Sequence, residues 1–236
     1  MRSTPENIDI IYEDNHLLVV NKRAGDLVQG DQTGDKPLVE IAKAYIGKKY
    51  NKPGKVFLGV VHRLDRPTSG VVVFARTSKA LSRLNAMFQK RETEKTYWAV
   101  VEHSPEAKQA QLTHFLVRNP KQNKSYAHSK EVANSKKASL SYKVLKRLKN
   151  YTALEINLHT GRHHQIRTQL AAIGCVIKGD LKYGAKRSNP DGSIHLHAYR
   201  LVLNHPVKKT PLELLALPNT ADPIWDALIE SDKAHA

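Results

Sequence analysis

The sequence is short of several features that would place it in other protein classes. Among its 236 residues Cys175 is the only cysteine, so neither an internal disulfide nor a thiolate zinc cluster can form. No stretch approaches the roughly 20 apolar residues that cross a bilayer, and the N-terminal residues lack the apolar core of an export signal. These absences predict a protein without a membrane partner, in a reducing, cytoplasmic setting.

Acidic residues are also scarce relative to basic ones. There are 22 Asp and Glu against 38 Lys and Arg, which gives a net charge of +16 with neutral histidines. Residues 118–149 hold ten Lys and Arg but a single acid, Glu131. Clustered cations attract phosphates without regard to sequence, so nucleic acid is the favoured partner. A solvated hairpin whose lysines protect an exposed sheet edge explains the same run nearly as well.

The hydrophobic pattern predicts many strands and few helices. Apolar residues alternate, or form short runs, at 8–12, 17–20, 60–61, 71–75, 95–101, 112–117, 140–144 and 154–158. Helices are expected to begin near Asp35–Pro37, Ser78, Thr160 and Asp222–Pro223, where capping residues precede amphipathic segments. The pattern favours an α+β fold with a mostly antiparallel central sheet flanked by helices. The length allows one catalytic domain over residues 1–236, or two sub-domains that share a cleft.

One polar segment lies between two apolar runs, at a strand-to-loop junction where site residues often occur. Residues 61–70 read Val-His-Arg-Leu-Asp-Arg-Pro-Thr-Ser-Gly and place Asp65 between Arg63 and Arg66. Two neighbouring cations keep a carboxylate ionised and held by charge-assisted hydrogen bonds, as a nucleophile requires. Taken alone, such a cluster is more often an Asp–Arg pair that stabilises a turn.

The run HRLDRPTSGVVVFART, which begins at His62, resembles the catalytic motif of RluA-type RNA pseudouridine synthases. Other segments resemble further motifs of that family and follow in its order, from about Ile8 to Pro206. They are IYED through LLVVNK at 11–22, KTYWAV at 95–100, LHTGR with QIR at 158–167, GD with YG at 179–184, and HLHA with HP at 195–206. Departures from the family pattern occur at Arg23, His163, Thr168 and Gln169.

The resemblance implies a role for each matching residue. Asp65 would be the catalytic carboxylate, and Arg63 would enter the helical stack when the uridine leaves it. Tyr97 would lie against the flipped base, and Arg167 would pair with Asp65. Extruding a nucleotide costs stacking energy, which an inserted side chain and an aromatic face reduce. The supporting positions are His62, Leu64, Arg66, Thr68, Ser69, Gly70, Arg162, Gln165 and Ile166.

The resemblance also implies the reaction: isomerisation of chosen uridines to pseudouridine in structured RNA, whether ribosomal, transfer or both. The glycosidic carbon–nitrogen bond breaks and builds positive charge on the sugar, which a carboxylate can stabilise or trap. The sequence leaves open whether Asp65 attacks the sugar, attacks the base or removes a sugar proton. We expect no cofactor, a basic catalytic cleft, a monomer, and no N-terminal accessory domain because the pattern begins by Ile8.

Other functions account for parts of this pattern. A non-catalytic RNA-binding or ribosome-associated module explains the charge but gives no reason for Asp65 between arginines. A nucleobase deaminase requires a zinc pattern that the chain lacks. Four histidines suggest core or RNA-facing positions more than a metal site, because no carboxylate or thiol follows at a recognisable spacing: His163, His164, His195 and His197. Cys175 is predicted to be a small buried hydrophobic residue.

Overall fold

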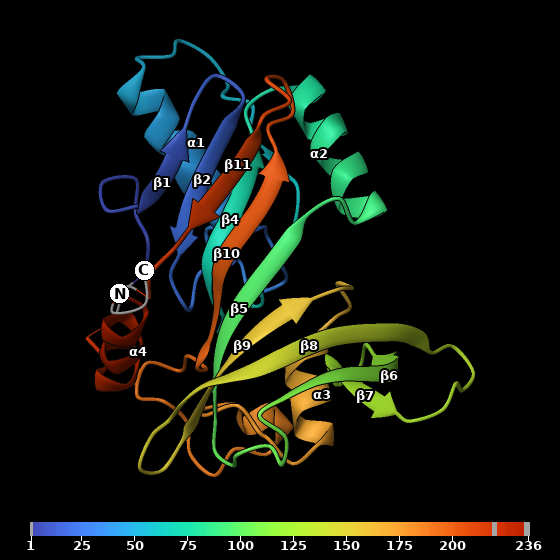
Figure 1. The fold of residues 1–236 in the computed structure, drawn as a ribbon. Coiled ribbons are helices and arrows are strands. Elements are labelled where there is room, and N and C mark those ends of the chain that lie inside the picture. The colour runs from blue at the N-terminus through green and yellow to red at the C-terminus, as the bar shows by residue number, and fades with distance from the viewer. Residues whose placement is uncertain (1, 219–220, 234–236) are drawn as a thin grey trace. The chain divides into compact units, whose positions relative to one another are not determined.

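The computed structural model describes residues 2–218 and 221–233, and the chain divides into two compact units (Figure 1). Unit 1 consists of Met1–Glu94 and Ala198–Asn219, and unit 2 consists of Lys95–His197 and Thr220–Ala236. In both units helices pack against antiparallel strands, which confirms the α+β class. That the whole chain works as one catalytic domain stays a prediction.

Unit 1 is a sheet covered by one helix on each face. Its strands follow the order β1-β2-β4-β10, with β3 paired to β4 and β11 paired to β10. The strands are β1 (Ile10–Glu13), β2 (Leu17–Lys22), β3 (Gly59–Val60), β4 (Ser69–Ala75), β10 (Leu196–Asn204) and β11 (Pro211–Leu215); the helices are α1 (Leu38–Lys49) and α2 (Ser78–Lys90). All six residues of β2 are buried.

The alternation of side chains along β2 explains this burial. Leu17 and Val19 pack with Leu84 of α2, whereas Leu18 and Val20 pack on the opposite face in the core that contains α1. A strand covered on both sides reads as a continuous apolar run rather than an alternating one. The runs at 17–20 and 71–75 are therefore the central strands of unit 1.

Unit 2 is an antiparallel sheet with a helix against it. Its strands follow the order β5-β9-β8-β6-β7. They are β5 (Glu94–Val101), β6 (Gln109–Asn119), β7 (Lys124–His128), β8 (Lys136–Arg147) and β9 (Thr152–Leu158); the helical elements are α3 (Gln165–Ala172), the 3-10 turn η1 (Leu181–Tyr183) and α4 (Pro223–Lys233). Ile166 and Leu170 of α3 pack into the core formed by β5, β8 and β9.

Two helix starts differ from the sequence-based expectation. Thr77, not Ser78, caps α2, because its hydroxyl accepts a hydrogen bond from the backbone N–H of Ala80 at 3.1 Å. Thr160 does not cap α3, which begins at Gln165 after a left-handed residue, His164 (φ 53°). The Thr160 hydroxyl instead donates to the side-chain oxygen of Gln165 at 2.7 Å.

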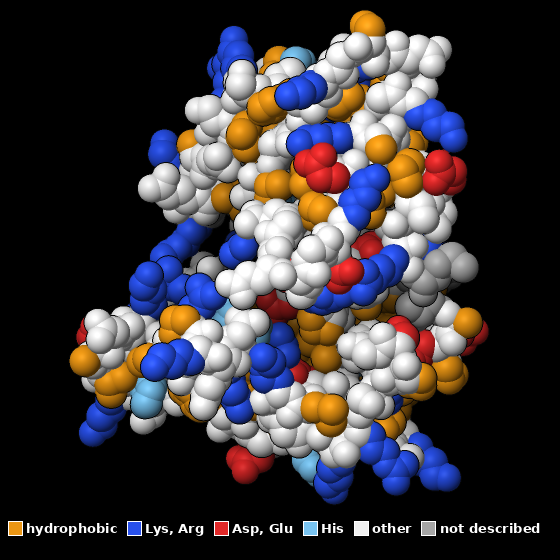
Figure 2. Space-filling model, turned by 180° about the vertical axis from the view of Figure 1, so that it is seen from behind, with side chains coloured by type: hydrophobic (Ala, Val, Ile, Leu, Met, Phe, Trp, Pro, Cys, Tyr) orange, Lys and Arg blue, Asp and Glu red, His pale blue; other side chains and the backbone are white. Residues whose placement is uncertain are grey.

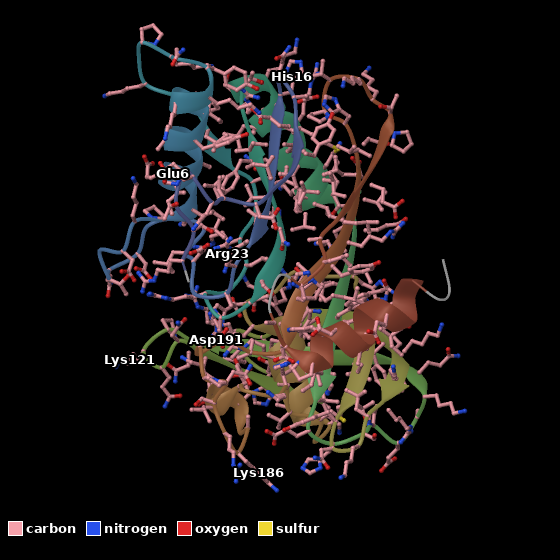
Figure 3. The ribbon with its side chains drawn as sticks, turned by 90° about the vertical axis from the view of Figure 1, so that its left-hand side faces the viewer. Glu6, His16, Arg23, Lys121, Lys186 and Asp191 are labelled. Carbon is pink, nitrogen blue, oxygen red and sulfur yellow. The ribbon has the colours of Figure 1, made fainter. Side chains whose placement is uncertain are left out.

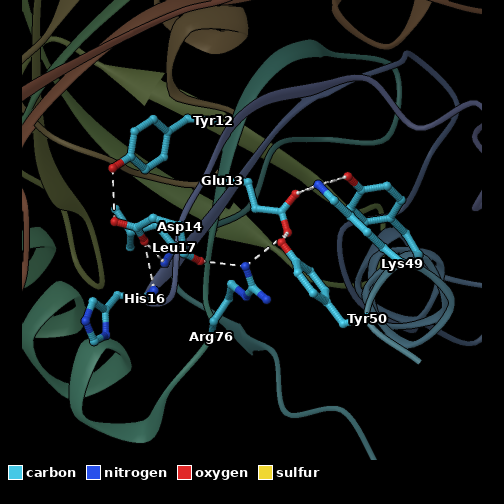
Figure 4. Close-up of polar contacts among 9 residues, drawn as sticks. Tyr12, Glu13, Asp14, His16, Leu17, Lys49, Tyr50 and Arg76 are labelled. Atoms are coloured by element: carbon cyan, nitrogen blue, oxygen red, sulfur yellow. Dashed lines mark hydrogen bonds and ion pairs between the residues drawn. The ribbon is translucent and has the colours of Figure 1, made fainter. Parts of the chain in front are cut away.

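An ion pair of Arg76 fixes the C-terminal end of β4 (Figure 4). The Arg76 guanidinium donates to Glu13 at 3.0 Å and to the backbone carbonyl of Asp14 at 2.6 Å. Glu13 also accepts hydrogen bonds from Lys49 and Tyr50, both at 2.7 Å, at the C-terminal end of α1. Arg76 therefore joins β4, the β1–β2 turn and α1, which is a structural role.

The basic stretch at 118–149 folds into a hairpin and the strand beside it. It covers the end of β6, all of β7 and β8, and the turns between them. Lys and Arg side chains are far more frequent than acidic ones on the face drawn in Figure 2. Within the described part of the chain, every helix is too short or too polar to cross a membrane.

Candidate active site

The HRLD segment forms the loop between β3 and β4 in unit 1. Asp65 is half-buried, and its carbonyl accepts a hydrogen bond from Thr68 N–H at 3.0 Å, which closes a turn. Arg63 is exposed, whereas Thr68 is only 2% exposed. The loop thus presents Arg63 to solvent and keeps the carboxylate partly shielded.

A buried lysine binds the backbone of this loop. Lys22, at the end of β2 opposite Gly70 of β4, is fully buried and donates to three backbone carbonyls, of Arg23, Arg66 and Thr68, at 2.9, 3.2 and 2.7 Å. Burial lowers the pKa of Lys22 to about 7, while the negative charges of Asp26 and Asp65 act in the opposite direction. Three acceptors match the three N–H bonds of an ammonium group, so this cradle favours the charged form.

Arg66, the residue after Asp65, is held by an ion pair. The Arg66 guanidinium pairs with Asp35, which also accepts a hydrogen bond from Arg2 at 2.7 Å. The two arginines lower the pKa of Asp35. The Arg66 carbonyl accepts from Gly25 N–H at 2.8 Å in addition to Lys22. Arg66 is therefore directed at Asp35 and serves to position the loop.

His62 and Gly70 fix the two ends of the segment. Nε2 of His62 accepts a hydrogen bond from Val73 N–H at 3.0 Å, and its ring stacks on Phe88 of α2 at 4.8 Å. Gly70 has φ 114°, and a Cβ there would lie 2.3 Å from the Ala198 carbonyl oxygen of β10. Only glycine permits this approach of two backbones. Leu64 packs against the core that contains α1, and Ser69 begins β4.

In unit 2 the HTGR and QIR residues lock α3 onto β8. The Gln165 amide oxygen accepts from Thr160 and from Arg162 N–H, and its amide nitrogen donates to the Ser139 carbonyl at 3.0 Å. The Arg162 side chain donates to the Lys137 carbonyl at 3.2 Å, and Ile166 is buried in the core. These supporting residues act by placing the helix that carries Arg167.

Arg167 is held rigidly by two neighbours. Its Nε and one terminal nitrogen donate to the two oxygens of Asp180 at 2.7 and 2.8 Å, and both side chains are buried. The guanidinium carbon also lies 5.1 Å from the ring centroid of Tyr183. A bidentate pair fixes the plane of the guanidinium, so Arg167 presents its remaining edge in one direction.

Tyr97 lies on β5, where it stands opposite Ile156 of β9 and is half-buried at the edge of the unit 2 core. The pairing of β5 with β9 fixes the backbone that carries the Tyr97 ring. Two of the four histidines named above have clear polar neighbours: Nδ1 of His164 lies 3.0 Å from the Tyr183 hydroxyl, and Nε2 of His195 lies 3.1 Å from Asp222. Cys175 is buried in the unit 2 core, as expected.

Sequence reasoning assigned no role to three residues that the structure places at the centre of these networks. They are Lys22, Asp180 and Tyr183, all within segments whose resemblance was recognised. Lys22 lies two residues after the apolar run at 17–20, in the same strand. A lysine so close to a buried run was the available signal, because a buried lysine is rare and needs partners. The pairing of Asp65 with Arg167 joins residues of different units and stays a prediction.

Comparison with known proteins identifies the family. RNA pseudouridylate synthases match this chain over residues 16–172, a range that includes Asp65, Tyr97 and Arg167. An uncharacterized RNA pseudouridine synthase of Aquifex aeolicus is 36% identical over 217 residues, covering 86% of this chain and 68% of that protein. The ribosomal large subunit pseudouridine synthase D of Xylella fastidiosa is 34% identical, covering 91% of this chain and 67% of that protein.

The fold agrees with this result. The structure of human RNA pseudouridylate synthase domain containing 4 superposes with a TM-score of 0.75 at 23% identity, covering 95% of this chain and 93% of that one. The chain spans only part of some relatives, 62% of one from Synechocystis sp. and 57% of one from Chlorobaculum parvum. Family match, relatives and fold coincide, and the chain belongs to the RNA pseudouridine synthases of the RluA type.

Proposed function

We propose that this chain converts uridine to pseudouridine in structured RNA, with Asp65 as the catalytic carboxylate. The observation that carries the proposal is the geometry of the HRLD loop. Lys22 holds three carbonyls of or beside the loop, and Arg66 is anchored on Asp35. A half-buried carboxylate on a loop fixed in this way is suited to chemistry on a bound nucleotide.

The reaction needs one ionised carboxylate at the sugar or the ring of an extruded nucleotide. The N1–C1′ bond breaks, the uracil turns, and C5 forms the new bond to C1′ while the C5 hydrogen leaves as a proton and N1 gains one. Charge builds on the sugar during bond cleavage, which a carboxylate stabilises. The exposed Arg63 side chain is suited to fill the gap that the nucleotide leaves in the stack.

Unit 2 is proposed to supply the other half of the site. In this hypothesis Tyr97 contacts the flipped base, and Arg167 pairs with Asp65 to favour its charged form inside a basic cleft. The orientation of Arg167 by Asp180 supports this assignment, because a guanidinium has more N–H donors than one bidentate carboxylate uses. Turnover of Arg167→Ala should fall more than its RNA affinity.

The substrate is proposed to be large-subunit ribosomal RNA, on the strength of the Xylella relative's name. Transfer RNA is the second candidate. The proposal includes a monomer and a reducing cytoplasmic setting, the latter supported by the single, buried cysteine. Maps of pseudouridine in RNA from cells with and without the gene identify the target: a uridine modified only when the gene is present.

Tritium release from RNA labelled at uridine C5 tests the catalytic role. We expect Asp65→Asn to abolish release while RNA affinity stays within about tenfold, because phosphate contacts supply most of the binding. Asp31→Asn is the matched control, an exposed carboxylate in the same unit, and should behave as the wild type. Release by Asp65→Asn would reject the assignment, and a wild type that binds RNA without release would favour a non-catalytic RNA-binding module.

A further inference from the structure

We propose that Tyr183 is a positioning residue that fixes Arg167 and the basic β6–β7 hairpin as one assembly. This inference rests on the proposed function, because it assigns Tyr183 an effect on turnover through Arg167. Tyr183 lies in the 3-10 turn η1, three residues after Asp180, and is 9% exposed. Its hydrogen-bond and cation–π partners among the described residues lie within unit 2.

The hydroxyl of Tyr183 makes three hydrogen bonds. The backbone N–H of Ser125 in β7 donates to it at 2.9 Å, and the hydroxyl of Thr168 in α3 donates to it at 3.0 Å. Nδ1 of His164 lies 3.0 Å away. A hydroxyl has two acceptor sites and one hydrogen, so two donors fill the acceptor sites and the hydrogen goes to His164. The group is saturated and joins three segments.

The ring of Tyr183 contributes separately from its hydroxyl. The Arg167 guanidinium lies over it at 5.1 Å, as does the Lys124 ammonium of the hairpin at the same distance. Asp180 holds Arg167 from its edge, so the guanidinium is fixed both in its plane and against an aromatic face. Thr168 follows Arg167 directly, which means that the hydroxyl is bonded to the same turn of α3.

On its other side Tyr183 is bonded to the hairpin next to its turn, where Ser125 of β7 pairs with Arg118 of β6. Ser125, which donates to Tyr183, also bonds through its hydroxyl to His163 at 2.9 Å. Nε2 of His163 lies 3.1 Å from Oδ1 of Asn123 in the hairpin turn. The His163 ring stacks on His164 at 3.8 Å. His163 therefore joins the hairpin turn to the residue that precedes α3.

The hairpin turn carries the cations that suit RNA phosphates. Lys121, labelled in Figure 3, is exposed in this turn, and Lys124 follows at the start of β7. Lys182, next to Tyr183, donates to the carbonyls of Gln122 and Asn123 at 3.3 and 3.1 Å. A phosphate bound at the turn would therefore be held at a fixed distance from Arg167. Without the Tyr183 hydroxyl, the hairpin and α3 would lose their shared bond.

Tyr183→Phe tests the inference, because it keeps the ring and removes the hydroxyl. With the C5-tritium assay we expect kcat to fall about tenfold while KM for RNA stays within about threefold. Both constants are taken per folded enzyme, so a loss of stability alone would not lower kcat, whereas a lost RNA contact would raise KM.

Tyr142→Phe is the matched control. Tyr142 is also buried in unit 2, and its hydroxyl donates to the Ala107 carbonyl at 3.3 Å, outside this network. It should leave kcat and KM unchanged. Thr168→Val removes one of the three hydrogen bonds and decides the question if Tyr183→Phe does not fold; a smaller drop in kcat at unchanged KM supports the inference.

Wild-type kcat in the folded Tyr183→Phe variant, or in Thr168→Val if the former does not fold, would overturn it. A wild type that releases no tritium rejects the proposed function and this inference with it. An active wild type with an unaffected Tyr183→Phe rejects this inference alone.

Discussion

Replacement of Asp180 by Asn should destabilise unit 2 and reduce turnover together. The change keeps the size of the side chain and one oxygen acceptor but removes the negative charge that faces Arg167. Arg167 and Asp180 are only 5% and 1% exposed, so water cannot replace the lost charge. The result would be a buried guanidinium whose main fixed anion has gone.

The magnitude follows from the burial of this pair. Breaking a buried ion pair by removing one partner costs about 3–5 kcal/mol, and the acceptor that Asn retains places the cost near the lower end. For a chain of this size each kcal/mol shifts Tm by about 2–4 °C, so we expect a drop of about 6–12 °C. Turnover should fall further than the folded fraction, since Arg167 would no longer be held in one plane.

Tryptophan fluorescence is a suitable assay because both tryptophans, Trp98 and Trp225, belong to unit 2 and are buried. Urea titration followed in this way reports the free energy of unfolding of the unit that contains Asp180. Asp191→Asn is the control, the same chemical change at an exposed position of the same unit (Figure 3). It should alter stability by about 0.5 kcal/mol or less.

If the free energy of unfolding of Asp180→Asn lies within about 1 kcal/mol of the wild-type value, the reasoning is refuted. The pair would then contribute no more than an exposed salt bridge does. Equal turnover of the two proteins under conditions where both are folded would show that Asp180 does not orient Arg167 for the reaction.

Three further outcomes are expected. Lys22→Met should lower stability by about 1–3 kcal/mol, because the Thr68 carbonyl loses its bond, and should lower kcat more than RNA affinity; equal kcat would contradict the cradle. Gly70→Ala should cost about 3 kcal/mol or more in thermal unfolding followed by circular dichroism, whereas Gly25→Ala, with φ 94° in open space, should cost about 1 kcal/mol. Burial lowers the pKa of His195 to about 4, below its unfolded value, so the unfolded state binds the extra proton between about pH 6.5 and 4. Stability in urea should therefore fall by up to about 3 kcal/mol over that window and less steeply in His195→Gln.

The parts of the fold that the sequence could predict are those where a single physical rule decides. Apolar runs at 17–20 and 71–75 indicated strands, and the structure places them at the centre of unit 1. The HRLD segment was expected at a strand-to-loop junction and lies between β3 and β4. Local pattern and tertiary environment agree at these positions.

Prediction was poorer where residues compete for the same partner. Thr160 has the chemistry of a helix cap, but its hydroxyl bonds Gln165, so α3 begins later than expected. Asp35 likewise looked like part of a helix start, yet it accepts hydrogen bonds from two arginines, Arg2 and Arg66. Capping propensity is a local property. A cation that is distant in the sequence forms a stronger hydrogen bond with a carboxylate than a backbone N–H does.

The partner of Arg167 could not be found from spacing alone. Asp180 lies thirteen residues further on, after the end of α3 and a loop that includes Gly174 and Gly179, both with positive φ. Which acid such a loop brings to a buried arginine depends on its path, and no periodic rule describes that path. The resemblance named one partner for Arg167, and the structure shows a second that the motif did not reveal.

The second partner changes what Arg167 is able to contribute. Asp180 largely balances the charge of the Arg167 guanidinium within unit 2. Arg167 would therefore stabilise another carboxylate mainly through its oriented N–H donors and less through its net charge. Oriented donors stabilise a charged group only when it sits at hydrogen-bonding distance, whereas a bare charge acts over a longer range. The fixed plane of Arg167, the saturated hydroxyl of Tyr183 and the carbonyl cradle of Lys22 all restrict position rather than add charge. The positions of Asp65 and Arg167 are thus each fixed by contacts within their own unit before RNA binds.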